Sequence, residues 1–431
     1  MKILVIGSGG REDAFLWKFQ KEENVEKIYI SPGHSAMERF SKVSLLGKKD
    51  HAELLSFALE NKIDLTVVGP EAPLTQGLSD LFSANGLKLF GPHEAAAKLE
   101  GSKIFSKHFM KRHGIPTAKY ETYQSYDEAL VGLRNWPVEE QGIVIKADGL
   151  AGGKGVVVAH DRAQSEQTLH DFMVNDKVSV KSDEILFEAV LPGEEVSAFA
   201  LCHGEEFFFL GCACDHKRVF DNDEGPNTGG MGCFHSPSWP DQQLVEKIKE
   251  QVLKKTLKGL QSEGTPFSGF LFMGLMIDEK SDPYVVEYNV RMGDPETQTL
   301  FPLLKGNLSQ SLLALLNNEP LKSRDLSLEE LCSVHVVMTS GGYPSIDDTP
   351  LELGHTIQGT DSVEGHLFLA GVGHNDSGDL INRGGRVLGV TALGATIEEA
   401  RELAYQDIAK IDFKAKHYRR DIGQKERGQG R

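Results

Sequence analysis

The sequence is poor in cysteine and contains no long apolar run. Its five cysteines are odd in number and show no CxxC spacing, and no His or Cys pair completes a zinc site beside Cys212 and Cys214. We therefore expect reduced, structural cysteines, which fit a cytoplasmic protein. The opening MKILVIGSGG is too short in apolar residues for a signal peptide or a membrane helix, and no later stretch is long enough to span a bilayer.

Basic residues are also scarce. The chain has 46 Lys and Arg against 63 Asp and Glu, a net charge of −17, which argues against a nucleic-acid-binding surface. Because the long-range field then opposes anionic ligands, the basic residues that serve such ligands must be locally concentrated. At 431 residues, with 40% hydrophobic and 25% charged residues, the chain is typical of a globular protein of about three domains. We expect a monomer.

The first hundred residues alternate short apolar segments with helix-like segments, which predicts a parallel, doubly wound α/β sheet. The expected strands are Ile3–Ile6, Lys27–Ile30, Leu65–Val68 and Lys88–Phe90. Loops rich in glycine and proline follow these strands, and ligands in such sheets bind at the carboxyl ends of the strands.

The remaining chain predicts three further segments. A helix within 101–120 leads into an α+β unit at about 120–191, with strands at Gly142–Lys146, Gly155–Ala159 and Glu184–Ala189. A mixed unit at 192–325 has strands around 195–213 and 270–290 and a helix near 241–262. A last small unit at 330–422 has strands Ser333–Met338 and Arg386–Leu393 and a helix that begins at Thr396 with the capping box TIEE. The residues after 422 are polar and are expected to be disordered.

The most informative stretch is Val285–Gln298, which reads VVEYNVRMGDPETQ. Side chains alternate faces along a strand, so Glu287, Asn289 and Arg291 share one face at spacings of ~7 Å. A carboxylate and an amide oxygen suit a hard cation such as Mg²⁺, and an arginine beside them suits a carboxylate or a phosphate. The alternative is a solvated strand edge followed by a polar loop.

The first glycine-rich loop, GSGGRE at Gly7–Glu12, is a poor dinucleotide fingerprint. Glu12 stands where the third glycine is required, and Ser31-Pro32-Gly33 stands where a ribose-binding acid is expected. A nicotinamide-dependent oxidoreductase is therefore disfavoured. A glycine turn at a helix N-terminus is still able to hold a phosphate, with help from Arg11.

The second loop, DGLAGGKGV at Asp148–Val156, joins two strands and is not a Walker loop, because glycine follows Lys154. Its four glycines resemble a flap that closes over ATP phosphates, with Lys146 placed to touch them. A glycine-rich hairpin with a solvated lysine is the alternative. Downstream, Phe187–Ser197 reads FEAVLPGEEVS, a strand edge suited to pairing with adenine, with Glu195 available to ribose hydroxyls.

The third loop, GPNTGGMG at Gly225–Gly232, is predicted to form a cradle of backbone amides for an anion. Just upstream, Asp215, Lys217 and Arg218 are available to a polar substrate. His216 is a candidate general base because histidine ordinarily titrates near neutral pH, but a histidine in such a run is more often structural.

Taken in order, these blocks resemble one family closely. They are GSGGRE, VGPEAPL, GSK, VIKADGLAGGKGV, GEEVS, DHKR, GPNTGGMG, an acid-x-Asn strand with RMGDPETQ, and GGRVLGVTALG. The chain is identified as similar to the phosphoribosylamine–glycine ligase (glycinamide ribonucleotide synthetase) family of the ATP-grasp superfamily, from Met1 to about Gly423. The pair GPNTGGMG and RMGDPETQ is highly specific, whereas the lysines and the flap are shared across ATP-grasp enzymes.

The resemblance implies a multi-domain α/β ligase. Its parts would be a Rossmann-like domain at 1–101, an ATP-grasp domain at 102–325 with a lid at about 120–191, a C-terminal α+β domain at 330–422, and a polar tail at 423–431. The implied activity is the ATP-dependent joining of glycine to 5-phosphoribosylamine through glycyl phosphate, in purine biosynthesis. The alternatives are another ATP-grasp carboxylate–amine ligase and a non-catalytic nucleotide-binding module, which would be expected to have lost a lysine or a metal ligand.

The resemblance also implies roles for individual residues. Glu287 and Asn289 would bind Mg²⁺ or Mn²⁺, and the catalytic residues would be Arg291, Lys146 and Asp294. The ATP-binding residues would be Lys103, Lys146, Gly152, Gly153, Lys154, Gly155, Glu188, Val190 and Glu195. The residues for phosphoribosylamine and glycine would be Gly10, Arg11, Pro70, Glu71, Asp215, Lys217, Asn227, Thr228, Gly229, Gly230, Met231, Arg291, Asp294 and Glu296.

Overall fold

The computed structural model describes residues 1–152, 154–175, 182–319, 321, 326–345 and 349–424. The N-terminal unit is a five-stranded parallel sheet of order β3-β2-β1-β4-β5. Its strands are β1 (Lys2–Gly7), β2 (Lys27–Pro32), β3 (Val43–Leu45), β4 (Leu65–Val68) and β5 (Leu89–Phe90). The four predicted strands are confirmed. Strand β3 was not predicted, because three residues give no readable period.

Helices cover this parallel sheet, as the doubly wound prediction requires. They are α1 (Gly10–Gln20), α2 (His51–Asn61), α3 (Glu71–Thr75), α4 (Leu78–Ala84) and α5 (Glu94–Gly101). Helix α1 begins directly after the glycine turn that follows β1, and α3 begins directly after the turn that follows β4. Both turns therefore lie at the carboxyl edge of the sheet, where the predicted ligand-binding residues stand.

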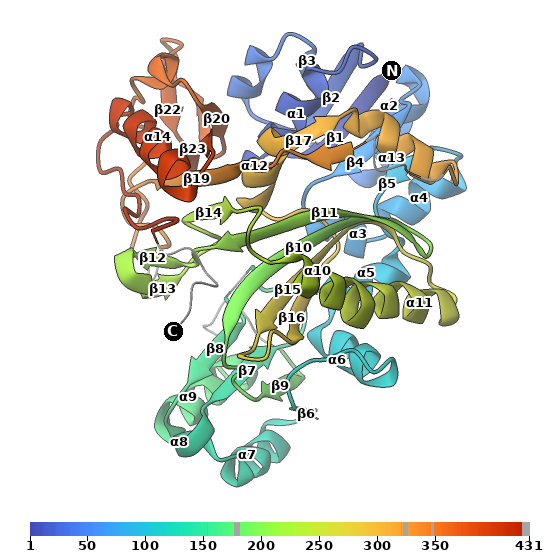
Figure 1. Cartoon of the computed structure of the whole chain (residues 1–431), viewed down its shortest axis with the longest axis vertical. Helices are drawn as coiled ribbons and strands as arrows, with labels where there is room; N and C mark the ends of the chain where they lie inside the picture. The colour runs from blue at the N-terminus through green and yellow to red at the C-terminus, as the bar shows by residue number, and fades with distance from the viewer. Residues whose placement is uncertain (153, 176–181, 320, 322–325, 346–348, 425–431) are drawn as a thin grey trace.

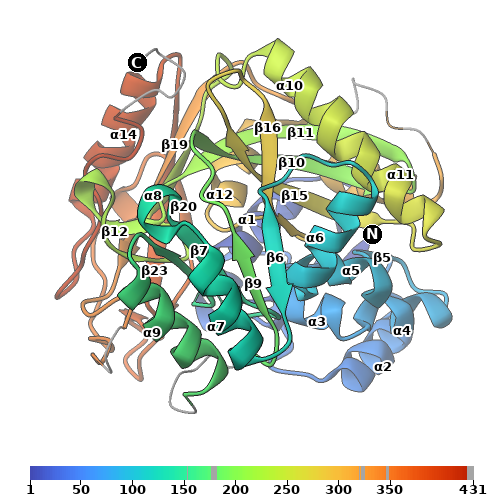
Figure 2. The same cartoon turned by 90° about the horizontal axis from the view of Figure 1, so that it is seen from below.

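The segment after α6 (Lys103–Arg112) folds into a lid-like unit with its own core. Its sheet has the order β6-β9-β7-β8 and is antiparallel. The strands are β6 (Tyr120–Tyr123), β7 (Ile143–Ala147), β8 (Val156–Ala159) and β9 (Ile185–Glu188), and the helices are α7 (Tyr126–Asn135), α8 (Val138–Gln141) and α9 (Arg162–Met173). Figure 2 shows α7 and α9 on the face of this sheet that points away from the rest of the molecule.

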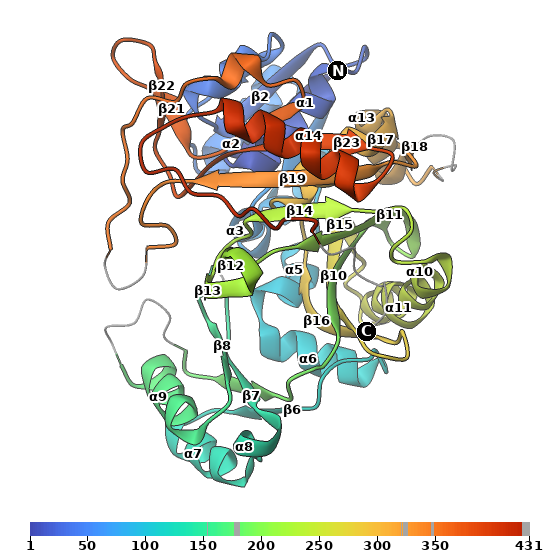
Figure 3. The same cartoon turned by 60° about the vertical axis from the view of Figure 1, so that its left-hand side comes forward.

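An eight-stranded sheet forms the centre of the molecule, with the order β16-β15-β10-β11-β14-β19-β23-β20. Its strands are β10 (Glu194–His203), β11 (Glu206–Asp215), β14 (Gly232–His235), β15 (Ser268–Ile277), β16 (Pro283–Asn289), β19 (Cys332–Thr339), β20 (His366–Leu369) and β23 (Arg386–Gly394). Strand β14 pairs with β19, so strands from before and after residue 330 share this sheet. In Figure 1 the N-terminal unit lies above strands β10 and β11 and the lid-like unit lies below them, while the C-terminal strands β19, β23 and β20 lie at the upper left, and Figure 3 shows β14 beside β19.

Helices and short hairpins complete the fold. The helices are α10 (Gln242–Ile248), α11 (Lys254–Ser262), α12 (Glu296–Leu300), α13 (Leu308–Leu316) and α14 (Ile397–Lys410). The hairpins are β12 (Arg218–Phe220) with β13 (Glu224–Asn227) and β21 (Val372–His374) with β22 (Leu380–Asn382). Strand β17 (Leu304–Gly306) also pairs with β18 (Leu326–Leu328), with α13 between them in the chain. The helix predicted near 241–262 is α10 and α11, joined by one π-helical turn at Lys249–Leu253.

The capping box predicted for α14 is half correct. The Thr396 side chain accepts from the Glu399 amide at 3.2 Å, as an N-cap should. The Glu399 carboxylate, however, accepts from the amide of Ala395 at 2.6 Å instead of that of Thr396. The Glu399 carboxylate therefore binds the amide of the residue before the N-cap and not that of the N-cap itself.

Three other expectations concern the whole chain. All five cysteines are buried, and none forms a disulfide with another described residue. In the described part of the chain, no helix combines the length and the apolar character that crossing a bilayer requires. Of the predicted polar tail at 423–431, residues 425–431 lie outside the described residues.

Candidate active site

The acid-x-amide strand is the base of the site. Asn289 Nδ2 lies 3.5 Å from Glu287 Oε1, and Arg291 Nη2 donates to Asn289 Oδ1 at 3.0 Å. The three side chains therefore share one face, as predicted. Gly274 on β15 stands opposite Glu287, and a Cβ there would lie 3.2 Å from Glu287 Cγ, so glycine leaves room for the acid.

The charge of Glu287 is set by the cations around it. Burial raises the pKa of this carboxyl, but Lys217 and Lys146, with the amide of Asn289, bring the net pKa below its ordinary value. The group is therefore an ionised carboxylate beside the Asn289 amide, whose nitrogen faces the carboxylate and whose oxygen accepts from Arg291. The two side chains together supply a carboxylate oxygen and an amide oxygen. These are the donors that a hard cation such as Mg²⁺ or Mn²⁺ takes, with phosphate oxygens and water completing the shell. Among the described residues there is no metal-type cluster of three or more His, Cys, Asp or Glu.

Arg291 joins the strand to the N-terminal unit. Its Nε lies 3.2 Å from Glu71 Oε2, and its Nη2 lies 3.0 Å from Glu100 Oε1. The second oxygen of Glu100 accepts from the Val290 amide at 2.7 Å. Burial raises the pKa of Glu100 to about 7, against the opposing effect of Arg291. Glu71 was predicted for this site. Glu100 was not, because an acidic residue on a helix is usually exposed at the surface.

Two lysines share one glutamate on the side of the lid-like unit. Lys146 Nζ lies 2.8 Å from Glu188 Oε1, and Lys107 Nζ lies 2.9 Å from Glu188 Oε2. All three side chains are buried. Burial lowers the pKa of Lys107 to about 8, with Glu188 acting in the opposite direction. Glu188 was predicted for its backbone, but its carboxylate also pairs the two lysines, and Lys107 was missed.

The glycine flap is tied to the start of α6. The carboxylate of Asp148 accepts from the Ser102 hydroxyl at 3.0 Å and from the Ile104 amide at 3.0 Å. Lys103 Nζ donates to the Gly149 carbonyl at 2.7 Å, and burial lowers the pKa of this lysine. The flap continues through Gly152, whose φ is +54°, a conformation that favours glycine.

The other predicted ATP-side residues flank this flap. Gly153 lies outside the described residues. Lys154 is exposed, its amide donates to the Ala151 carbonyl at 3.0 Å, and the Gly155 carbonyl accepts from the Ala147 amide at 2.9 Å. Val190 lies two residues after the end of β9.

The GPNTGGMG loop differs from its prediction. Four consecutive amides, those of residues 228–231, donate within the protein. Their acceptors are the Lys217 carbonyl at 2.7 Å, the Tyr343 hydroxyl at 3.2 Å, the Thr228 hydroxyl at 3.0 Å and the His216 carbonyl at 2.8 Å. The expected cradle of free amides is therefore not formed by these groups. Asn227, the last residue of β13, leads into the loop and is exposed.

Arg386 joins this loop to the RMGDPETQ segment. Its Nη1 donates to the Gly229 carbonyl at 2.6 Å and to the Asp294 carbonyl at 2.7 Å. Its Nη2 lies 3.3 Å from Asp294 Oδ1. Burial raises the pKa of Asp294, but Arg386 and Arg11 bring the net pKa below its ordinary value. Arg386 belongs to the block GGRVLGVTALG, but its contact with Asp294 was not predicted from the sequence.

Two carboxylates lie next to this loop. Burial raises the pKa of Asp215, with Glu296 adding to the effect, and burial raises the pKa of Glu296. The Ser197 hydroxyl donates to Glu296 Oε1 at 3.1 Å, whereas Asp215 Oδ1 is buried without a hydrogen-bond partner among the described residues. Lys217 forms an ion pair with Glu195, the residue predicted for ribose.

The His216 ring lies 5.9 Å from that of Phe234, between centroids. This packing supports the structural interpretation of the histidine over the general-base one.

The N-terminal glycine turn also departs from its prediction. Glu12 Oε2 accepts from the amides of Ser8 at 3.0 Å and Gly9 at 2.6 Å, so the position expected for a phosphate is filled by the protein's own carboxylate. Arg11, predicted to help, donates from Nε to Glu12 Oε1 at 2.6 Å. A Cβ on Gly69 would lie 1.7 Å from Glu12 Oε1, which explains the glycine before Pro70.

The predicted residues of the N-terminal unit nevertheless reach the RMGDPETQ segment. Arg11 Nη1 donates to the Met292 carbonyl at 3.1 Å. A Cβ on Gly10 would lie 2.5 Å from Gln298 Nε2, so the backbone of α1 approaches α12 closely. Pro70 immediately precedes Glu71, which contacts Arg291. The N-terminal unit (Arg11 and Glu71), the lid-like unit (Lys146) and the C-terminal part (Arg386) thus all contact β16 or the loop that follows it.

A glycine-rich lid hairpin, paired lysines and an acid-x-amide strand on a central antiparallel sheet define the ATP-grasp class of ligases. Three family models of phosphoribosylglycinamide synthetase match the chain: the N domain at residues 1–100, the ATP-grasp (A) domain at 101–297 and the C domain at 333–425. The chain belongs to the phosphoribosylglycinamide synthetase family.

Individual proteins agree with this placement. The phosphoribosylamine–glycine ligase of Escherichia coli (strain K12) is 42% identical over 427 residues, which is 98% of each chain. The crystal structure of the phosphoribosylamine–glycine ligase from Thermotoga maritima has a TM-score of 0.83 at 34% identity, covering 98% of this chain and all of that one. A biotin carboxylase from Campylobacter jejuni has a TM-score of 0.70 at 12% identity, covering 96% of this chain and 92% of that one, and shares the fold alone.

These matches confirm the predicted family and three-domain ATP-grasp fold. They also confirm the predicted enzyme class, an ATP-dependent carbon–nitrogen ligase, and the predicted activity, phosphoribosylglycinamide synthesis in the purine pathway.

Proposed function

We propose that this site joins glycine to 5-phosphoribosylamine in two steps, through glycyl phosphate, and that the residues around β16 carry both steps. The observation that carries the proposal is the row of side chains Glu287, Asn289 and Arg291 on β16 and just after it. The arginine contacts Glu71 of the N-terminal unit, and the nearby Lys217 and Lys146 lower the pKa of Glu287, so its carboxylate stays ionised. Such a row places a cation-binding pair and an anion-binding guanidinium side by side, as phosphoryl transfer to a carboxylate requires.

The nucleotide lies between the lid and the large sheet in this proposal. Lys103 and Lys146 bind its phosphates, and the flap residues Gly152, Gly153, Lys154 and Gly155 cover them. The backbone at Glu188 and Val190 faces the adenine and Glu195 faces the ribose. Glu287 and Asn289 hold Mg²⁺ or Mn²⁺, which when bound neutralises charge on the phosphate oxygens.

In the first step an oxygen of the glycine carboxylate attacks the γ-phosphorus of ATP. The bond between that phosphorus and the β–γ bridging oxygen breaks, and ADP leaves. Arg291 and Lys146 neutralise the transferring phosphoryl oxygens, and Asp294 holds Arg386 and the GPNTGGMG loop in place. The closed lid keeps water from the acyl phosphate.

In the second step the amine nitrogen of phosphoribosylamine attacks the carbonyl carbon of glycyl phosphate, and phosphate leaves. A cationic or proton-donating amino group needs a carboxylate partner, and Asp215 has a buried oxygen without one. We assign Asp215 and Glu296 to the substrate amino groups. The pocket for phosphoribosylamine and glycine is completed by Gly10, Arg11, Pro70, Glu71, Lys217, Asn227, Thr228, Gly229, Gly230 and Met231.

Oxygen labelling tests the glycyl phosphate step. Glycine with both carboxylate oxygens replaced by ¹⁸O should give inorganic phosphate that carries one ¹⁸O atom per turnover, because one carboxylate oxygen leaves with the phosphoryl group. Phosphate without label, formed at the same rate as the amide product, would contradict an acyl phosphate. The monomeric state, the cytoplasmic location, the choice between Mg²⁺ and Mn²⁺, and the domain bounds 1–101, 102–325 and 330–422 stay predictions.

A further inference from the structure

The hairpin that precedes the GPNTGGMG loop lies outside the large sheet. Its strands β12 and β13 pair only with each other in the described part of the chain, and they connect Lys217 at one end with Asn227 at the other. Both of these residues belong to the proposed substrate pocket. The position of the hairpin therefore affects two sides of that pocket at once.

The turn of this hairpin has an unfavourable backbone. Asn222 and Asp223 have φ values of +59° and +57°, in the left-handed region that residues other than glycine adopt at a cost. Asparagine and aspartate tolerate this region better than most residues, so the turn keeps its shape at a modest cost and outside contacts decide where it lies.

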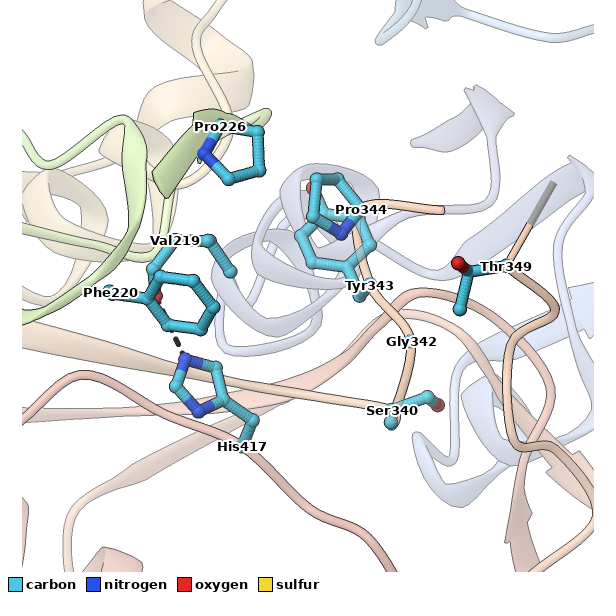
Figure 4. Close-up of a pocket in the computed structure, with 10 residues that line it drawn as sticks. Val219, Phe220, Pro226, Ser340, Gly342, Tyr343, Pro344, Thr349 and His417 are labelled. Atoms are coloured by element: carbon cyan, nitrogen blue, oxygen red, sulfur yellow. Dashed lines mark hydrogen bonds between the residues drawn. The ribbon is translucent and has the colours of Figure 1, made fainter. Parts of the chain in front are cut away.

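Apolar packing under the hairpin is incomplete. A cavity of about 390 Å³ separates Phe220 and Pro226 from Tyr343 and Pro344, and Figure 4 shows these side chains facing each other across it. Phe220 is 50% exposed as a residue, whereas its neighbour Val219 is 1% exposed. The buried Val219 anchors β12, but Phe220 and Pro226 lack close apolar packing against the loop at 340–344.

Polar contacts from the end of the chain hold the hairpin as well. We name residues 417–421, which follow α14, the C-terminal clamp. Arg419, 1% exposed as a side chain, lies at its centre. Its Nη1 donates to the Arg218 carbonyl at 3.0 Å and to Asp223 Oδ1 at 2.8 Å, while Nε and Nη2 donate to the two oxygens of Asp421 at 2.8 and 2.7 Å.

Three further clamp residues bind the same hairpin. Asp421 Oδ2 accepts from the Asn222 amide at 2.8 Å, and the Arg420 amide donates to Asp221 Oδ1 at 2.7 Å. His417 Nε2 donates to the Val219 carbonyl at 2.8 Å, the bond drawn in Figure 4. In the described part of the chain, the hydrogen bonds that reach 218–224 from outside the hairpin come from this clamp.

The clamp is itself attached to rigid elements. The His417 amide donates to the Thr339 carbonyl on β19 at 3.0 Å. The Tyr405 hydroxyl on α14 donates to the Arg419 carbonyl at 2.7 Å. The chain thus runs from the C-terminal sheet and helix, through Arg419, to the hairpin that carries the substrate residues.

We propose that Arg419 is a positioning residue for the substrate pocket: it fixes the hairpin at 218–227 so that Lys217 and the GPNTGGMG loop reach phosphoribosylamine and glycine. This proposal rests on the proposed function for the identity of the ligands. Arg419 touches neither substrate, and its guanidinium acts through Asp223 and the Arg218 carbonyl. The fork matters as well as the charge, because one side chain donates to three groups in different directions.

The test uses the full-length protein and the variant Arg419→Met, with Arg420→Met as the matched control. Arg420 is the neighbouring arginine, and its side chain is exposed. Initial rates are measured against phosphoribosylamine and against glycine, and the Kd of ATP is measured separately by titration calorimetry. Arg419→Met should raise the KM for phosphoribosylamine or glycine by about tenfold or more, because misplaced binding groups lose orientation. The Kd of ATP should stay within about twofold, and Arg420→Met should match the wild type.

A second variant and a second readout guard against simple misfolding. Asp223 is 60% exposed as a side chain, so Asp223→Asn removes the hairpin's side of the ion pair without leaving a buried charge unpaired. It should raise the same KM values to a smaller extent. Hydrogen exchange of the segment 218–231 should be faster in Arg419→Met than in the wild type, while the lid segment 143–159 exchanges unchanged.

The outcomes separate the two proposals. Unchanged KM values in both variants, with kcat reduced only in proportion to lost folded protein, would overturn the positioning role. If the wild-type protein fails to turn over glycine and phosphoribosylamine, the proposed function is wrong, and hydrogen exchange at 218–231 still decides whether Arg419 holds the hairpin. Unchanged exchange there in Arg419→Met would overturn the clamp itself.

Discussion

Replacing Lys107 with methionine tests whether the lysine–glutamate–lysine cluster holds the ATP-side lysine in place. The Lys107 and Glu188 side chains are 2% and 3% exposed, and Glu188 lies 2.9 Å from Lys107 Nζ and 2.8 Å from Lys146 Nζ. Methionine keeps most of the apolar stem of Lys107 and removes its charge. The ion pair from Lys107 to Glu188 and the bond from Lys107 Nζ to the Thr117 hydroxyl at 2.6 Å are both lost.

The expected magnitudes follow from this geometry. Removing one partner of a buried ion pair destabilises a protein by about 3–5 kcal/mol, because the other charge is left unpaired. Glu188 keeps Lys146 as a partner, so the free energy of unfolding should fall by about 3 kcal/mol, the lower end of that range. Lys146 is then drawn more strongly to Glu188 and away from phosphate. The Kd of ATP should rise about tenfold, which corresponds to about 1.4 kcal/mol.

The assay combines urea unfolding with calorimetric titration of Mg-ATP at neutral pH. Lys111→Met is the matched control, because Lys111 lies one turn further along α6 and is exposed. It should change neither quantity by more than about 0.5 kcal/mol. A folded Lys107→Met protein with wild-type ATP affinity would refute the positioning of Lys146 by this cluster. So would an equal effect of Lys111→Met.

Three further predictions concern the other side of the site. Glu287→Gln should keep the fold but raise the Mg²⁺ concentration needed for half-maximal rate by about 10-fold or more, and an unchanged metal titration would contradict the ligand role. Because burial raises the pKa of Glu100 from 4.5 to about 7, its protonation stabilises the folded state fully below pH 4.5, and this stability is lost as pH rises through about 7. The free energy of unfolding, measured in urea, should therefore depend less on pH in Glu100→Gln than in the wild type between pH 5 and 8. The same pH dependence in both proteins would refute the raised pKa of Glu100. Gly230→Ala should abolish most ligase activity. The φ of Gly230 is +116°, and a Cβ there would lie 2.5 Å from Pro295 and 2.8 Å from Asp215. A rate above about half of the wild-type rate would contradict this prediction.

The sequence predicted the fold where the signal is local. Strands β1, β2, β4 and β5 are short apolar runs bounded by glycine and proline, and their positions agree within a few residues. The continuity of the large sheet was not predictable in this way. Its link is the pairing of β14 with β19, and a pairing between distant segments depends on tertiary packing that no local period reveals.

The site divides in the same way. Glu287, Asn289 and Arg291 were predicted to share a face because strand geometry alone decides it. Lys107 and Glu100 were missed, since a charged residue on a helix looks the same in sequence whether it faces solvent or a buried partner. Glu12 was read as a mismatch to a nucleotide fingerprint. Its role in filling the glycine turn with its own carboxylate depends on how the side chain folds back onto Ser8 and Gly9.

The most direct test of the central claim is ADP release by the purified protein with Mg-ATP and glycine, with and without freshly generated phosphoribosylamine. Sustained ADP release that requires both glycine and phosphoribosylamine, with one phosphate and one phosphoribosylglycinamide formed per ADP, is the predicted result. Sustained ADP release that is independent of phosphoribosylamine, or the absence of any turnover in a protein that binds ATP, would contradict the account.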